Sequence, residues 1–189
     1  FAVRAEDEND GVMIDSLWVN DVLTPVKSFN VSGTNAVLSR QSLANGQQLR
    51  FRIVYHYTLN KGSHNRTGEI EPNADFIAYF FPRVAVYDDI DGWNTYPYIG
   101  SQEFYNDFCH FNAAITVPAN FIVWATGDLK NGAEVLNPVY FNRLQEAEKN
   151  DGITTVIDTT ELSKKDFTPE GKAFNTWKYE ASNVTDFAF

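Results

Sequence analysis

The feature that most constrains this chain is a strict alternation of side-chain character between Leu49 and Leu59. Apolar and aromatic residues occupy every second position, namely Leu49, Phe51, Ile53, Tyr55 and Tyr57. The intervening positions carry mostly charged or polar side chains. Because successive side chains of a strand point to opposite faces, the pattern predicts a strand with one buried and one solvated face. A turn at Asn45-Gly46 is expected just before it.

Further short apolar segments predict a chain built almost entirely of strands. They span residues 12–19, with a bulge near Ser16, and then 76–81, 84–87, 104–117, 121–126, 153–157 and 174–181. A high aromatic content of 15% with a single Met also favours sheets over helical bundles. We therefore predict an all-β fold over residues 1–189, an antiparallel two-layer β-sandwich forming a single domain.

One helix is expected, around residues 138–149. Asn137 is placed to cap it and Pro138 suits its first turn. Tyr140, Leu144 and Ala147 fall on one side of such a helix.

Charge and composition exclude several classes of partner. The formal net charge of −10 makes nucleic acid a poor partner for the surface as a whole. No run reaches the roughly 18 apolar residues of a transmembrane segment. The single cysteine, Cys109, allows neither an internal disulfide nor a Cys-rich zinc site.

The three histidines, His56, His64 and His110, lack the surroundings of a zinc peptidase site. Such a site needs two His four positions apart on a helix, with a Glu beside the first. Cys109 and His110 are adjacent, and adjacent strand side chains point to opposite faces, so they make a poor nucleophile and base pair. We predict no catalytic residue and no metal ligand in this chain.

The acidic residues leave alternatives open. Asp88, Asp89 and Asp91 resemble half of a calcium loop, but no terminal Glu or flanking helices follow, so a solvated turn is the favoured interpretation. Glu103 and Asp107 remain a candidate paired-carboxylate site, because the sequence does not fix their separation.

Three aromatic residues, Trp93, Tyr96 and Tyr98, lie in a turn-rich stretch. Rings placed this way either stack on sugars or lie beneath a partner domain.

Several ordered blocks resemble a known family. Residues 79–93 read YFFPRVAVYDDIDGW. They are followed by EFY at 103–105, ITVPAN at 115–120, ATGDL at 125–129 and WKYEASNVTDFA at 177–188. Together the blocks resemble the N-terminal domain of bacterial members of the membrane-alanyl-aminopeptidase family, which are gluzincin zinc metallopeptidases.

The resemblance implies a saddle-like β-sandwich packed against a thermolysin-like zinc domain. It places the zinc ligands and the catalytic Glu after Phe189, so the chain is expected to be a fragment with no cofactor of its own. In the family, the N-terminal domain lends one polar residue, often Gln or Glu, to the pocket for the substrate's first side chain. The aligned residue here is Tyr79, which departs from that pattern but can donate a hydrogen bond.

The expected function is therefore that of a non-catalytic N-terminal domain of a zinc aminopeptidase-like metallopeptidase. Its partners are the catalytic domain of the same chain and, through the parent protein, the N-terminus of a peptide substrate. A periplasmic or cell-envelope location is expected. The alternative is a carbohydrate-binding or adhesion β-sandwich module.

Overall fold

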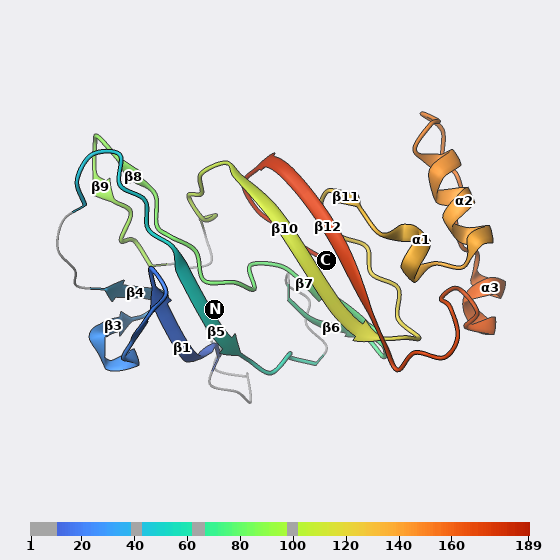
Figure 1. The fold of residues 1–189 in the computed structure, drawn as a ribbon, viewed down its shortest axis with the longest axis horizontal. Coiled ribbons are helices and arrows are strands. Elements are labelled where there is room, and N and C mark those ends of the chain that lie inside the picture. Colours follow the sequence, from blue (N-terminus) through green and yellow to red (C-terminus); the bar gives the residue numbers. More distant parts are fainter. Residues whose placement is uncertain (1–10, 39–42, 62–66, 98–101) are drawn as a thin grey trace. The chain divides into compact units, whose positions relative to one another are not determined.

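The computed structural model describes residues 11–38, 43–61, 67–97 and 102–189 (Figure 1). Antiparallel strands make up 37% of the structure and helices 13%, which confirms the predicted all-β fold. Residue contacts group the chain into two compact units, Phe1–Asp107 (unit 1) and Phe108–Phe189 (unit 2), where the sequence predicted one domain. Each unit is described by itself.

Unit 1 consists of short strands and one 3-10 turn. These elements are β1 (Met13–Val19), β2 (Val22–Thr24), η1 (Val26–Ser28), β3 (Phe29–Ser32), β4 (Asn35–Leu38), β5 (Phe51–His56), β6 (Thr67–Glu71), β7 (Ala74–Ile77), β8 (Tyr87–Asp88) and β9 (Gly92–Trp93). β1 is the centre of a three-stranded antiparallel sheet in the order β2-β1-β5, and β3–β4, β6–β7 and β8–β9 are separate two-stranded hairpins.

The β1–β5 pair confirms most of the alternation expected from the sequence. The register shifts between Ile14 and Ser16, as a bulge near Ser16 requires. Leu17 is buried opposite Ile53, whereas Phe51, at the start of β5, is 39% exposed and not buried as predicted. On the other face, the Arg52 guanidinium lies 4.6 Å from the centre of the Trp18 ring.

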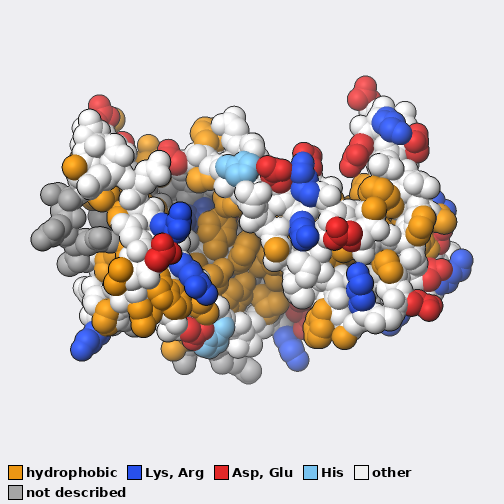
Figure 2. All heavy atoms as spheres, in the orientation of Figure 1, with side chains coloured by type: hydrophobic (Ala, Val, Ile, Leu, Met, Phe, Trp, Pro, Cys, Tyr) orange, Lys and Arg blue, Asp and Glu red, His pale blue; other side chains and the backbone are white. Residues whose placement is uncertain are grey.

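Unit 1 leaves many large apolar side chains at its surface. Among the residues of unit 1 that the structure describes, the buried apolar ones are few, namely Leu17, Val19, Ala78 and Val86. The sheet formed by β1, β2 and β5 exposes Met13, Val22, Leu23, Phe51 and Val54. Figure 2 shows hydrophobic side chains open to view over β1 and β5.

Unit 2 contains longer strands and three helices. Its elements are β10 (Cys109–Pro118), β11 (Asp128–Leu129), α1 (Gly132–Val135), α2 (Pro138–Ala147), α3 (Thr159–Lys164) and β12 (Phe174–Val184). β12 lies between β10 and β11 in one antiparallel sheet (Figure 1). In β10, Phe111, Ala113, Ile115 and Val117 are less exposed than their neighbours, as the sequence predicted.

The core of unit 2 is built on the inner face of β12. Trp177, Tyr179 and Ala181 are buried at every second position, and Trp177 has no exposed surface. Trp177 lies opposite Ile115 across the pair with β10. Phe187, Val135 and Leu136 are also almost fully buried, so side chains from the end of the chain and from α1 close this core.

Two segments predicted as strands, 121–126 and 153–157, are not strands, and others are shorter than predicted: only Tyr87 of 84–87 is strand, and the strand predicted at 104–117 begins at Cys109. Residues 121–126 form no backbone hydrogen-bond ladder with a neighbouring strand. Instead, Thr126 N donates to Ala188 O, and Val123 O accepts from the Tyr179 hydroxyl at 2.7 Å. Residues 153–157 form no ladder, and Ile153 is fully exposed. The continuous apolar run 76–81 is strand only as far as Ile77. In each case the apolar residues contact other elements or solvent instead of a partner strand.

The helix predicted at 138–149 is confirmed as α2, but it is one of three in unit 2. Asn137 stands at its N-cap without a side-chain capping bond, and instead its Nδ2 donates to Asp166 O. The prediction of a single helix missed α3, which begins with a complete capping box between Asp158 and Glu161.

Candidate functional site

Tyr79, the residue that the family resemblance singled out, lies at a strained backbone position just after β7. Its φ angle is +52°, a region that non-glycine residues adopt only when surrounding contacts enforce it. The preceding peptide is fixed, because Ala78 N donates to Thr67 Oγ1 at 3.0 Å and the Thr67 hydroxyl donates to Ala78 O. Strained residues held in this way cluster at functional sites.

The Tyr79 side chain joins a polar and aromatic cluster. Its hydroxyl donates to Glu103 Oε2 at 3.1 Å, and its ring lies 5.0 Å from that of Phe104. The Arg83 guanidinium carbon lies 5.5 Å from the Tyr79 ring centre, 4.7 Å from that of Phe81 and 5.4 Å from that of Phe104. We call these five residues the Tyr79 cluster.

The Tyr79 cluster combines a carboxylate, a guanidinium and three aromatic rings. Such a set suits recognition of a small polar organic group by hydrogen bonds and ring contacts. Glu103 belongs to this cluster, which the sequence did not predict. Asp107, the other member of the candidate carboxylate pair, is exposed.

The Asp88–Gly92 segment is the solvated turn that the sequence predicted, between β8 and β9. Asp88 Oδ1 accepts from Asp91 N at 2.8 Å and from Ile90 N at 3.0 Å. The backbone N–H of Asp91, followed by weaker hydrogen bonds, lowers the pKa of Asp88. The carboxylate therefore holds the turn together.

This turn presents aromatic rings at the surface. Tyr87 and Trp93 meet edge to face with ring centres 5.2 Å apart. Trp93 is 55% and Tyr96 76% exposed, so both rings are open to a ligand or partner. Tyr98 falls outside the described residues.

The described histidines contact carboxylate or hydroxyl groups. His56 Nδ1 lies 3.0 Å from Asp15, and His110 Nδ1 lies 2.6 Å from Ser182 Oγ. His64 is outside the described residues. Within the described ranges, no three His, Cys, Asp or Glu side chains converge on a position for a metal ion.

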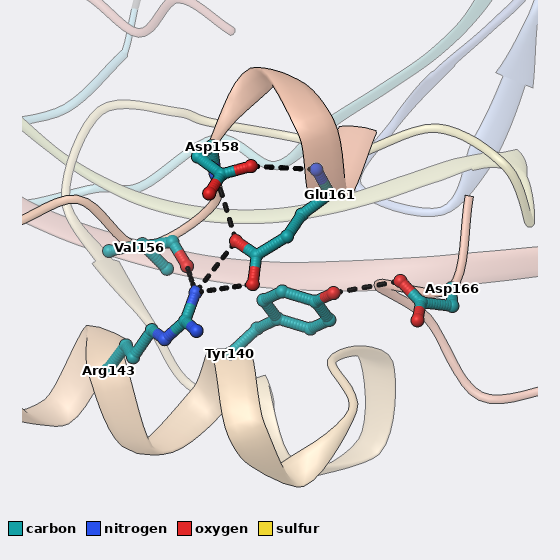
Figure 3. Close-up of polar contacts among 6 residues, drawn as sticks. All are labelled: Tyr140, Arg143, Val156, Asp158, Glu161 and Asp166. Atoms are coloured by element: carbon teal, nitrogen blue, oxygen red, sulfur yellow. Dashed lines mark hydrogen bonds and ion pairs between the residues drawn. The ribbon is translucent and has the colours of Figure 1, made fainter. Parts of the chain in front are cut away.

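A dense polar network, which the sequence did not predict, joins α2 to α3 in unit 2 (Figure 3). Arg143 Nη1 donates to both Glu161 carboxylate oxygens, at 2.9 and 2.7 Å, and to Val156 O at 3.1 Å. Glu161 also accepts from Asp158 N in the capping box. The spacing Asp158-x-x-Glu161 is the sequence signal that would have revealed this helix start.

The same network perturbs three pKa values. The hydrogen bond from Arg143 lowers the pKa of Glu161 and raises that of Arg143. The Tyr140 hydroxyl donates to Asp166 Oδ1 at 2.8 Å, and this bond raises the pKa of Tyr140 to about 12. Each charged group is bonded to a partner within the network. We therefore interpret the network as a structural link between α2 and α3.

Comparisons with protein-family models, with curated proteins and with solved structures found no match to this chain. In the part of the chain that the structure describes, no helix is both long and apolar enough to span a membrane.

Proposed function

We propose that this chain is a non-catalytic N-terminal domain of a zinc aminopeptidase-like metallopeptidase of the membrane-alanyl-aminopeptidase type. In this role it packs on a catalytic domain and forms part of the wall of the substrate cleft. The proposal combines the sequence blocks within residues 79–188 with two properties of unit 1.

The observation that carries the proposal is the apolar surface of unit 1. Among its described residues, sixteen large hydrophobic side chains are exposed and only four apolar side chains are buried. Val22 and Leu23 of β2, for example, are 68% and 62% exposed. A contiguous exposed apolar patch is typical of an interface with another protein or domain, and five of these side chains belong to the single sheet β2-β1-β5.

The Tyr79 cluster supports the cleft-lining part of the proposal. The enforced backbone at Tyr79 and its bond to Glu103 fix a hydroxyl and a carboxylate beside aromatic rings. Hydroxyl and carboxylate groups beside aromatic rings are the kind of lining with which a pocket orients a small polar group. In this proposal the metal that activates water for hydrolysis is held by the catalytic domain.

The first test is to isolate the parent gene and read the sequence that encodes the region after Phe189. We expect a His-Glu-x-x-His motif there, with a further Glu on the following helix. We also expect the isolated chain to bind no stoichiometric zinc and to cleave no aminoacyl amide. Activity that follows this polypeptide through purification, or a downstream sequence without the motif, would contradict the proposal.

The second test concerns Tyr79 in the full-length parent protein. Tyr79→Phe removes only the hydroxyl that bonds to Glu103. We expect a higher KM for aminoacyl substrates with kcat retained, because the hydroxyl contributes to binding in ground and transition states alike. Tyr87→Phe removes a hydroxyl from an exposed ring outside the cluster and should leave both constants unchanged.

A second candidate function is supported by the exposed rings of the β8–β9 hairpin. Trp93 and Tyr96 are open to solvent, and exposed rings on a rigid turn can stack on pyranose sugars. Glycan binding by the isolated chain that is lost in Trp93→Ala and kept in Trp124→Ala, an exposed Trp of unit 2, would favour a carbohydrate-binding module. Absence of glycan binding would leave the peptidase-domain proposal as the better account.

A further inference from the structure

The outward face of the β10–β12 pair carries a row of reactive side chains. The register places His110 directly opposite Ser182, so the two side chains lie on the same face. Glu180 is two residues before Ser182 on β12 and therefore shares that face. The sequence alone could not reveal this grouping, because it does not give the register between strands 70 residues apart.

This row places a hydroxyl within hydrogen-bond distance of an imidazole, and a carboxylate within ion-pair distance of the same ring. Ser182 Oγ lies 2.6 Å from His110 Nδ1. His110 Nε2 lies 3.4 Å from Glu180 Oε1, and the other Glu180 oxygen lies 3.3 Å from Lys130 Nζ. A hydroxyl bonded to an imidazole that a carboxylate orients is the arrangement that activates serine as a nucleophile.

We propose that Ser182 is an activated nucleophile that accepts an acyl group from activated esters. His110 removes the hydroxyl proton, and Glu180 is a positioning residue that holds the imidazole ring. The site is open to reagents, since Ser182 is exposed and the His110 side chain is about half exposed. This inference is independent of the proposed peptidase role, because it rests on unit 2 and involves no metal.

The reaction is a simple acyl transfer. His110 Nδ1 takes the proton from Ser182 Oγ as the oxygen attacks the ester carbonyl carbon. The bond to the leaving group then breaks, an aryl oxide departs with the bonding electrons, and the imidazolium proton passes to solvent. The product is an acyl ester on Ser182, and no oxidant, reductant or further reactant is needed.

The test is modification of the intact chain by 4-nitrophenyl acetate, followed by peptide mass spectrometry. We expect an acetyl group on Ser182 and no modification at that position in Ser182→Ala. His110→Gln should slow labelling at least about 100-fold, the smaller end of what a positioned general base contributes. Glu180→Gln should slow it less, with the thermal midpoint unchanged, because the amide keeps the shape of the carboxylate beside the ring but carries no charge.

A matched control lies on the same face of the same strand pair. Thr116 Oγ1 and Thr176 Oγ1 are 2.8 Å apart across the pair, with no imidazole bonded to either. These hydroxyls should remain unmodified when Ser182 is labelled, and Thr176→Val should label at the wild-type rate. Labelling of Ser182 that is equally fast in His110→Gln, or that does not exceed labelling of Thr116 and Thr176, would overturn the proposal.

Discussion

Among the described residues, unit 2 buries ten apolar side chains and exposes six large ones, whereas unit 1 buries four and exposes sixteen. The difference follows the lengths of the paired strands. β10 and β12 pair over ten residues, so one face of unit 2 repeats enough apolar positions to enclose Trp177. The strands of unit 1 have two to seven residues and are divided among a small sheet and three hairpins. Shorter strand pairs carry fewer apolar positions on one face, so more of their apolar side chains remain exposed.

The largest effect on stability is expected for Trp177 of unit 2, and the comparison is with Trp93 of unit 1. Trp177→Ala leaves a cavity in a fully buried site and should cost about 4 kcal/mol of unfolding free energy. Trp93→Ala removes an exposed ring and should change stability by less than about 0.5 kcal/mol. Urea titration measures the loss of unfolding free energy in both variants. Amide hydrogen exchange then localises the loss, in residues 109–118 and 174–184 for Trp177→Ala and in residues 87–93 for Trp93→Ala. Equal losses would contradict the division into a packed unit and an open one.

The next largest loss of stability is expected at Gly127, which packs closely against β12 in unit 2. A Cβ at Gly127 would lie 2.2 Å from the backbone oxygen of Glu180, and the φ angle there is +89°. Gly127→Ala should therefore cost about 3 kcal/mol, from backbone strain and overpacking together. Gly171 has a similar φ of +87° but nothing within 4 Å, so Gly171→Ala should cost only about 1 kcal/mol. A comparable loss in the two variants would exclude the predicted clash with β12.

A smaller, pH-dependent effect tests the tie between α2 and α3. The folded pKa of Glu161 lies below its ordinary value of 4.5, chiefly because Arg143 donates to it. The contact therefore stabilises the fold above pH 4.5, and this contribution is lost as the pH falls below that value. We expect Glu161→Gln to lower the Tm at pH 7 and the two melting curves to converge in acid. A constant difference between the variants at all pH values would show that the charge is not responsible.

The smallest stability effect is expected on the apolar surface of unit 1. Leu23→Ser changes a side chain that is 62% exposed, so the free energy of unfolding should shift by less than about 0.5 kcal/mol. Binding of a hydrophobic dye such as ANS should fall, because apolar surface is removed. A loss of 2 kcal/mol or more, checked by urea titration, would mean that Leu23 is part of a packed core.

The sequence predicted features that depend on local pattern and missed those that depend on partners. Alternation located β5 and β10, and Pro138 located α2. Apolar runs at 121–126 and 153–157 resembled strands, but a strand requires a neighbour that period-two alternation does not identify. The family resemblance singled out Tyr79, but no local pattern identified its contacts with Glu103, Arg83 and Phe104.

The measurement that tests the central claim most directly is hydrogen exchange, followed by mass spectrometry, on the isolated chain and on the full-length parent protein. The account holds that unit 1 presents its apolar faces to a second domain, whereas the sheet of unit 2 forms its own core. It predicts greater protection of residues 13–24 and 51–56 in the parent, with β10 and β12 equally protected in both samples. Identical exchange of residues 13–24 and 51–56 in the two samples would contradict it.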